Sequence, residues 1–195
     1  MQFQDLSLFR TPADFRGRPA WFVQLWWIVQ TLLFRPSPQF MYGWRRWLLR
    51  RFGARIGRGV IIRPTVRTQF PWKVSIGDYA WVGDDVNLYS LGTITIGAHA
   101  VISQKCYLCT GTHDASQLDF PIQQFPIVIE PECWLASDVF VYPGVTIGRG
   151  TVVGARSTVT KSLPGGKLCY GTPAIIQKDR PGKYVGQQSI YSTPR

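Results

Sequence analysis

The sequence predicts an all-β chain wound as a parallel β-helix, preceded by an extension that we expect to be helical. From Ile129 onward an aliphatic residue recurs at every sixth position, and a small or apolar residue follows each one four places later. Neither an α-helix nor an ordinary strand needs a period of six. A chain that turns a corner every six residues closes a triangular coil, and successive coils stack as parallel strands about 4.8 Å apart. The aliphatic positions are Ile129, Leu135, Val141, Ile147, Val153 and Val159, and the small or apolar positions are Cys133, Val139, Val145, Thr151, Ser157 and Leu163.

The same repeat runs upstream with slips in phase. It opens at Ile56 and shifts by two residues between Ile94 and Ile96. Ile129 follows Leu108 by 21 positions, three more than one coil of 18, so we expect a loop at about 112–127. The prediction is about five coils over residues 55–164, with extensions over 1–54 and 165–195. A sandwich of short strands is the alternative.

The positive charge is concentrated ahead of the repeat and on its first turn. Residues 1–72 hold 12 Arg and no Lys against Asp5 and Asp14, a net charge of +10, whereas residues 73–195 carry only +1. Tryptophan is also abundant there, at Trp21, Trp26, Trp27, Trp44 and Trp47. Trp beside Arg is typical of the membrane–water interface. The sequence therefore favours an anionic membrane surface as a partner, or a helical cap on the open end of the β-helix, or both. No motif for nucleic acid is present, so we do not expect that partner.

The apolar segment 19–34 is too short to cross a membrane, which takes about 20 apolar residues. It is not a signal peptide either, because acidic residues precede it and no small-residue cleavage site follows. If 20–34 is helical, Phe22, Trp26 and Val29 follow at steps of four and three, as do Val23 and Trp27. We therefore expect a helix that lies flat on a membrane, and a peripheral protein on its inner face.

Four cysteines in a chain of this size do not indicate a disulfide scaffold. Cys106 and Cys133 occupy the small slot of the repeat. The Cys106–Cys109 pair has no second CxxC with which to bind zinc. We expect reduced structural thiols, no metal and a cytoplasmic protein.

Only two histidines are present. His99 lies in the middle of a hexad, where side chains usually face outward. His113 ends the segment CTGTHD, where the coil breaks into the loop. A histidine at the base of a loop is well placed for proton transfer near pH 7. His113 is therefore the candidate catalytic residue.

The repeat, the break at TGTHD, the segment PIVIEPECWLASDVFVYPGVTIGRGTVVGARSTVTKSLP and the closing GTPA resemble the hexapeptide-repeat acyltransferases. The similarity is greatest to sugar O-acetyltransferases of the maltose, galactoside and nodulation-factor type. The Trp-rich N-terminus resembles the colanic acid biosynthesis acetyltransferases. The resemblance implies a left-handed β-helix, a homotrimer, and acetyl-CoA bound between subunits. It also implies acetyl transfer to the hydroxyl of a sugar or lipid-linked sugar in surface polysaccharide biosynthesis.

The resemblance also implies roles for particular residues. His113 is the general base, with Asp114 or Asp119 as alternatives for orienting its ring, and the backbone N–H of Ser137 is the oxyanion donor. Asn87 holds the acceptor sugar, and Asp114 is included in the acceptor site. Trp134 forms a wall of the acyl site. The acetyl-CoA positions are Ala136, Gly154, Ala155, Thr160, Lys161 and Lys178; Ile175 replaces a family cation, for which Arg156 or Arg180 could substitute.

Other readings of this fold remain open. A γ-type carbonic anhydrase needs three histidines around zinc, and the two present exclude it. A different acceptor, such as an amino sugar, an antibiotic or serine, is a nearer alternative. A scaffold without activity, docked on membranes through its N-terminal arm, is the third.

Overall fold

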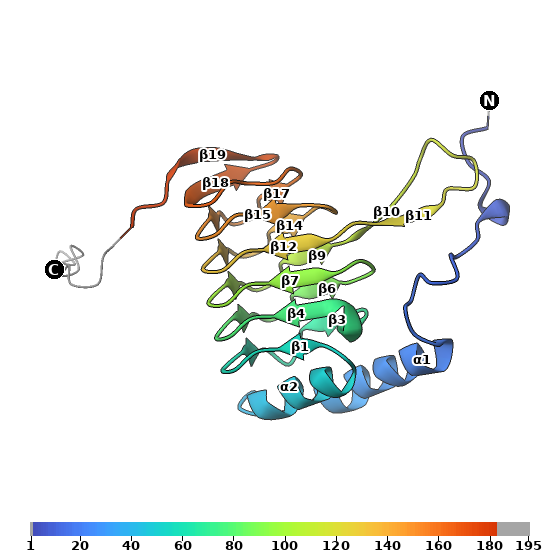
Figure 1. Cartoon of the computed structure of the whole chain (residues 1–195), viewed down its shortest axis with the longest axis horizontal. Helices are drawn as coiled ribbons and strands as arrows, with labels where there is room; N and C mark the ends of the chain where they lie inside the picture. The colour runs from blue at the N-terminus through green and yellow to red at the C-terminus, as the bar shows by residue number, and fades with distance from the viewer. Residues whose placement is uncertain (1, 183–195) are drawn as a thin grey trace.

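Three parallel sheets form the sides of a triangular prism, and each coil of the chain contributes one strand to each side (Figure 1). The computed structural model describes residues 2–182. Sheet A contains β1 (Arg55–Ile56), β4 (Val74–Ile76), β7 (Ile94–Ile96), β12 (Ile127–Ile129) and β15 (Thr146–Ile147). Sheet B contains β2 (Ile61–Ile62), β5 (Trp81–Val82), β8 (Val101–Ile102), β13 (Trp134–Leu135), β16 (Val152–Val153) and β18 (Lys167–Gly171). Sheet C contains β3 (Arg67–Thr68), β6 (Asn87–Tyr89), β9 (Tyr107–Cys109), β14 (Phe140–Val141) and β17 (Thr158–Val159).

The predicted β-helix of about five coils is confirmed. Sheet B extends beyond residue 164, because β18 pairs in parallel with β16 before β19 (Ala174–Asp179) folds back against it. The last part of the described chain therefore lengthens the prism.

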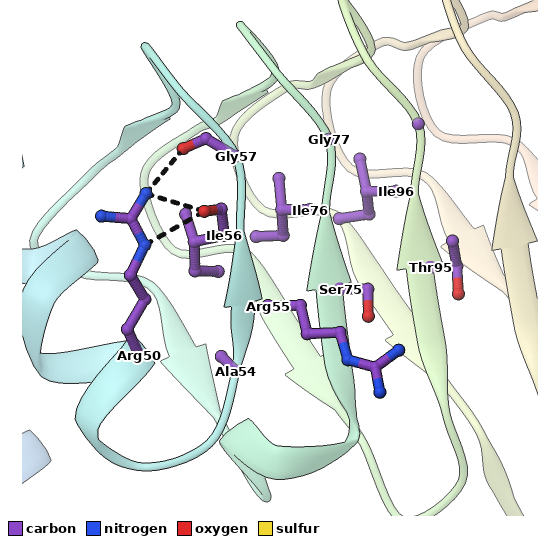
Figure 2. Close-up of a pocket in the computed structure, with 11 residues that line it drawn as sticks. Arg50, Ala54, Arg55, Ile56, Gly57, Ser75, Ile76, Gly77, Thr95 and Ile96 are labelled. Carbon is purple, nitrogen blue, oxygen red and sulfur yellow. Dashed lines mark hydrogen bonds between the residues drawn. The ribbon is translucent and has the colours of Figure 1, made fainter.

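The six-residue repeat fills the interior of the prism. Ile56, Ile76 and Ile96 are stacked one coil apart and buried, while their strand neighbours Arg55 and Ser75 stand on the outer surface (Figure 2). The small positions of the repeat are also buried, Cys133 among them. Burying this continuous apolar column is what stabilises the stack of coils.

The slip between Ile94 and Ile96 has a simple cause. Strands β4, β7 and β12 each have three residues, of which the first and third point inward, so Ile94 and Ile96 are both in the core. The corner from sheet C to sheet A is longer in the early coils, and one such corner contains η3 (Pro71–Lys73).

The other corners need a left-handed backbone conformation. At the corner from sheet A to sheet B, φ is 57° at Tyr79, 59° at His99 and 64° at Glu132, one residue per coil. Such values are uncommon outside glycine, so the coil geometry imposes them. His99 is exposed at this corner and stacks on Tyr79, with ring centroids 5.4 Å apart.

The predicted loop is a hairpin arm that projects from the prism (Figure 1). Strand β10 (Gly111–His113) pairs antiparallel with β11 (Ile122–Gln124). The N-terminal segment, which includes η1 (Leu6–Leu8), reaches the tip of this arm, where the Asp5 N–H donates to the Leu118 carbonyl at 2.7 Å.

The predicted helical extension covers the open end of the first coil. It comprises α1 (Ala20–Val29), the π-helical turn η2 (Gln30–Phe34) and α2 (Tyr42–Arg51). Trp26 is 0 % exposed, and its indole N–H donates to the Thr68 carbonyl at 2.8 Å. Arg45 is also fully buried and donates to the Ile62 carbonyl at 2.7 Å. These contacts fix the helices on the prism as a cap.

Of the apolar residues expected to follow along this helix, Trp26 and Val23 pack against the prism, which agrees with the cap alternative. A different apolar face of the same helical segment is exposed, and it carries Trp21, Leu25, Ile28 and Leu32. These residues follow at steps of four, three and four, which places them on one side. In residues 2–182 no helix is long and apolar enough to span a membrane.

Candidate active site

His113 is exposed on the hairpin arm and is fixed by the chain that returns along it. Its Nδ1 lies 2.9 Å from the Phe120 carbonyl oxygen, and its ring stacks on the Phe120 ring with centroids 4.4 Å apart. A carbonyl oxygen can only accept, so Nδ1 carries the proton in this arrangement. The lone pair of the neutral ring is then on Nε2, where a base needs it.

The proposal that Asp114 or Asp119 orients His113 is not supported, because the Phe120 carbonyl does so. The Asp114 carboxylate instead accepts hydrogen bonds within its own loop, from the backbone N–H and hydroxyl of Ser116 and from the Gln117 amide. The bonds to Ser116 hold the pKa of Asp114 below its usual value. The structure therefore favours a role for Asp114 in shaping the loop rather than in contacting a ligand.

Asn87 stands on the outer face of sheet C. It is paired in register with Arg67 on β3 and with Tyr107 on β9. The Tyr107 ring stacks on Phe140 in the next coil, with centroids 5.2 Å apart. This column of an arginine, an amide and aromatic rings offers hydrogen bonds and flat apolar surface, the two features that a sugar-binding face requires.

The corner from sheet B to sheet C brings together four of the predicted residues. Ala136 and Ser137 form this corner in one coil, and Gly154 and Ala155 form it in the next, with the Ala136 N–H donating to the Val153 carbonyl. In residues 2–182 the Ser137 N–H has no hydrogen-bond acceptor, so it is available to a ligand. The side chains at these four positions are small, so they place little bulk over this edge of the prism.

Two features of this corner bear on the sequence interpretation. A Cβ on Gly154 would lie 2.8 Å from Cβ of Tyr170, so packing inside the chain already requires glycine there. The Trp134 indole N–H donates to the Ser103 hydroxyl at 3.0 Å, and the ring is 47 % exposed on sheet B. Trp134 therefore lies on the surface beside the corner and not in the core.

The cationic candidates lie near the last coils. Thr160 and Lys161 are exposed at the corner that follows β17, and Lys178 is exposed on β19. Of the two possible substitutes for the missing cation, Arg180 donates to the Glu132 and Gly150 carbonyls, each at 2.8 Å. Arg156 is more accessible, with only a loose contact of 3.6 Å to Asp138.

Within a single chain, the candidate active-site residues do not all lie close together. His113 leaves the prism at the corner between sheets C and A, whereas Ser137 lies at the corner between sheets B and C. The full width of sheet C separates the two corners. His113 and Ser137 therefore belong to different edges of the same prism.

Lys73 is a residue that sequence reasoning missed. Its ammonium group donates to the Phe15 carbonyl at 2.8 Å, to the Leu91 carbonyl and to Oε1 of Gln124 at 3.0 Å. Burial lowers its pKa. Lys73 thus joins the N-terminal segment, the prism and strand β11 of the arm that carries His113. The sequence does not predict these contacts, because the partners of Lys73 are distant from it along the chain.

Other features of the described residues are structural. All four cysteines are unpaired thiols, and burial raises the pKa of Cys106 to about 11, so it is unreactive near neutral pH. Within 2–182 no group of three His, Cys, Asp or Glu side chains could hold a metal ion. A shallow hollow of ≈ 630 Å³ on sheet A is lined by Arg50, Arg55 and Ser75 (Figure 2). Asn87 lies on a different sheet, sheet C.

The coils, the hairpin arm with its histidine and the small-residue corner define a transferase built on hexapeptide repeats. The family described as "Bacterial transferase hexapeptide (six repeats)" matches residues 126–161. The "Putative colanic acid biosynthesis acetyltransferase WcaF" of Escherichia coli (strain K12) is 63% identical over 177 residues, which are 91% of this chain and 97% of that protein. The chain belongs to the hexapeptide-repeat acetyltransferases, whose β-helix is left-handed.

Two more distant relatives are also acetyltransferases. The galactoside O-acetyltransferase of Lactococcus lactis subsp. lactis (strain IL1403) is 31% identical over 135 residues, 67% of this chain and 65% of that protein. The crystal structure of a hexapeptide-repeat acetyltransferase of Vibrio cholerae O1 biovar eltor, complexed with acetyl coenzyme A, superposes with a TM-score of 0.73 at 25% identity. It covers 87% of this chain and 88% of that one.

Proposed function

We propose that this protein transfers an acetyl group from acetyl-CoA to a sugar hydroxyl in exopolysaccharide biosynthesis. The relationship to a colanic acid biosynthesis acetyltransferase over nearly the whole chain supports the pathway. The sugar O-acetyltransferase relatives support the acceptor class, and the acetyl-CoA complex of a relative supports the donor. The single observation that carries the reaction is the hydrogen bond from His113 to Phe120, because it leaves Nε2 ready to accept a proton.

In the proposed mechanism Nε2 of His113 takes the proton of the acceptor hydroxyl as that oxygen attacks the thioester carbon. A hydroxyl is a poor nucleophile until its proton has somewhere to go. A C–O bond forms, and the negative charge moves to the former carbonyl oxygen. The C–S bond then breaks, and His113 returns its proton to the departing thiolate, so the acetyl ester and a free thiol result.

Ser137 supplies the donor for that oxyanion through its backbone N–H. The half-buried position of Ser137 at the corner and the lack of an acceptor for its N–H in the described chain support this role. A fixed backbone donor stabilises charge that develops in the transition state without needing to reorient. Trp134, three residues earlier on β13, contributes an apolar wall beside the acyl group.

The donor's thioester supplies the activated acetyl group, and the corner between sheets B and C is the track proposed for its pantetheine arm. Ala136 and Ala155 keep this edge shallow enough for a chain to lie against it. Lys161 and Lys178 provide positive charge for the phosphates, and Arg156 is better placed than Arg180 to add to it.

We also propose that the protein is a homotrimer with each site shared between two subunits. His113 and Ser137 lie on different edges of one prism, so a neighbouring subunit must bring the second edge to the first. A closed three-fold ring completes three such sites at once.

Peripheral binding to an anionic membrane completes the proposal. Trp21, Leu25, Ile28 and Leu32 form an exposed apolar helix face in the most basic part of the chain. An apolar face with flanking Arg suits a helix that lies in the headgroup region. Each Arg near an anionic leaflet adds about 1 kcal/mol.

The proposed function is tested by following thiol release from acetyl-CoA with a panel of sugars, and by mass spectrometry of the products. An acetyl ester on a sugar, formed only with acetyl-CoA and enzyme, is the expected result. Acetylation of amines in preference to hydroxyls would identify another acceptor class. Binding of acetyl-CoA without transfer to any sugar would contradict the proposal.

A further inference from the structure

A polar groove of ≈ 440 Å³ lies where the N-terminal extension meets sheet C. Arg67, Asn87 and Tyr107 stand side by side on its floor, each one coil from the next. Gln30, the first residue of η2, and Arg35, which directly follows η2, line the groove on the side of the helical extension. The proposed acceptor-binding residue Asn87 therefore lies between an aromatic ring and an arginine, with a second arginine across the groove.

Arg35 and Arg67 are exposed and have no ion-pair or hydrogen-bond partner for their side chains within residues 2–182. No Asp or Glu is among the described residues that line the groove. Arg58 and Arg63 on the same coil are paired, with Asp78 at 3.3 Å and with Asp84 at 2.7 Å. Two unmatched guanidinium groups beside one groove create a local positive potential that favours an anionic ligand.

The wall that carries Arg35 is fixed relative to the floor. Oε1 of Gln30 accepts a hydrogen bond from the Thr68 N–H at 2.7 Å, directly beside Arg67. The buried Trp26 indole donates to the carbonyl of the same Thr68. Because Thr68 is held on both sides by the helical segment, the two arginine backbones keep a set separation. The groove is thus a built feature and not a chance gap between mobile side chains.

We propose that Arg35 and Arg67 bind the diphosphate of the acceptor, which is a glycosyl diphosphate and not a neutral sugar. This inference rests on the proposed function, since it names the acceptor class of the same site. The planar guanidinium matches phosphate with two parallel hydrogen bonds, and two arginines match two phosphates. Asn87 then contacts the sugar attached to the diphosphate, and Tyr107 provides a face on which the sugar ring packs.

A glycosyl diphosphate occurs either in a nucleotide sugar or on a lipid carrier. The groove would bind the sugar and the diphosphate, which these two sources have in common. The wall of the groove continues into the helical segment whose far side exposes Leu25, Ile28 and Leu32. A diphosphate in the groove would contact the same helical segment that carries this apolar face, and an attached carrier chain could pass around the segment into a membrane. The KM comparison below therefore includes one acceptor from each source.

The first measurement is calorimetric binding of inorganic pyrophosphate to the full-length protein in saturating CoA, which occupies the site for the donor's own phosphates. We expect one site per chain, weakened about tenfold or more by Arg35→Gln or Arg67→Gln, as expected when a charged hydrogen bond is lost. Arg58→Gln is the matched control, because Arg58 is an exposed arginine of the first coil outside the groove. Unchanged thermal melting confirms that the variants are folded.

Loss of pyrophosphate binding when CoA is added would show that the arginines bind the donor, and it would overturn the inference. Equal binding by the wild type and both groove variants would overturn it as well. These results are independent of turnover, so they leave the proposed acetyl transfer standing. Failure of acetyl transfer to every sugar, with pyrophosphate binding intact, would instead count against the proposed function.

The second measurement compares KM for a nucleotide-linked sugar, for the same sugar on a short prenyl diphosphate, and for its methyl glycoside. Both diphosphates should have a lower KM than the glycoside, and only their KM should rise in Arg67→Gln, with KM for acetyl-CoA unchanged. A lower KM for the prenyl form in vesicles identifies the lipid source, and a lower KM for the nucleotide form identifies the nucleotide. A methyl glycoside as good as both diphosphates, and insensitive to Arg67→Gln, overturns the inference.

Discussion

The carbonyl oxygen of Phe120 lies 2.9 Å from Nδ1 of His113 and sets which nitrogen of the ring carries the proton. The two residues face each other across the hairpin arm, and their rings are stacked with an interplanar angle of 9°. A backbone carbonyl holds the ring without adding a negative charge next to it, unlike the carboxylate that often orients a catalytic histidine.

His113→Ala should lower kcat by about 10²–10⁴, the range for a lost general base. The side chain is exposed, so melting temperature should hardly change. His99→Ala is the control, since His99 sits at a different corner and stacks only on Tyr79. Steady-state kinetics on purified protein measures both. Equal losses in the two variants would show that neither histidine is the base.

Ser137→Pro should lower kcat by about 10²–10³, because it removes the proposed oxyanion donor. Ser137→Ala should retain most activity, since it keeps the N–H and loses only the hydroxyl. Proline is compatible with this corner, because Pro64 occupies the equivalent place in the first coil. Kinetics of the two variants, with circular dichroism for folding, would separate backbone from side chain. A strong loss in Ser137→Ala alone would assign the role to the hydroxyl.

Mixing two inactive variants tests whether the site is shared between subunits. If each site takes His113 from one chain and Ser137 from a neighbour, co-expressed His113→Ala and Ser137→Pro chains should regain activity. Random mixing pairs two intact halves in about a quarter of the interfaces of a three-fold ring. Activity that stays at the level of the single variants, in mixed trimers verified by two affinity tags, would mean that each chain holds a whole site.

Lys73→Met should lower kcat and loosen the arm while leaving the prism folded. Methionine keeps most of the volume but loses the hydrogen bonds to Phe15, Leu91 and Gln124. Hydrogen exchange should speed up in residues 111–124 and not in the strands of the prism, which identifies a positioning role. Lys105→Met, at an exposed corner, is the control. Unchanged exchange in the arm would show that Lys73 does not hold it.

The sequence predicted the prism well because the repeat is itself geometric. A period of six can satisfy only a coil of short strands, so the buried state of Ile129 and Cys133 followed from their positions. The buried face of the N-terminal helix was harder to predict. A helix that is apolar on all sides has no periodic pattern that distinguishes the face of Trp26 from that of Leu25. A hydrogen bond to a backbone carbonyl, such as that of His113 with Phe120, does not depend on the residue type of the acceptor, so the sequence does not predict it.

The exposed face of the N-terminal helical segment should bind anionic vesicles. Leu25→Gln with Leu32→Gln removes apolar surface from that face without touching the buried side, so membrane binding should fall while the melting temperature stays the same. Leu118→Gln is the matched control, since Leu118 is an exposed leucine on the arm. Sedimentation with vesicles of anionic and of neutral lipid, at low and high salt, measures the effect. The arginines predict binding that weakens as salt rises, because screening reduces their attraction to the leaflet. If the wild type ignores anionic vesicles at low salt, the helices serve only as the cap of the β-helix.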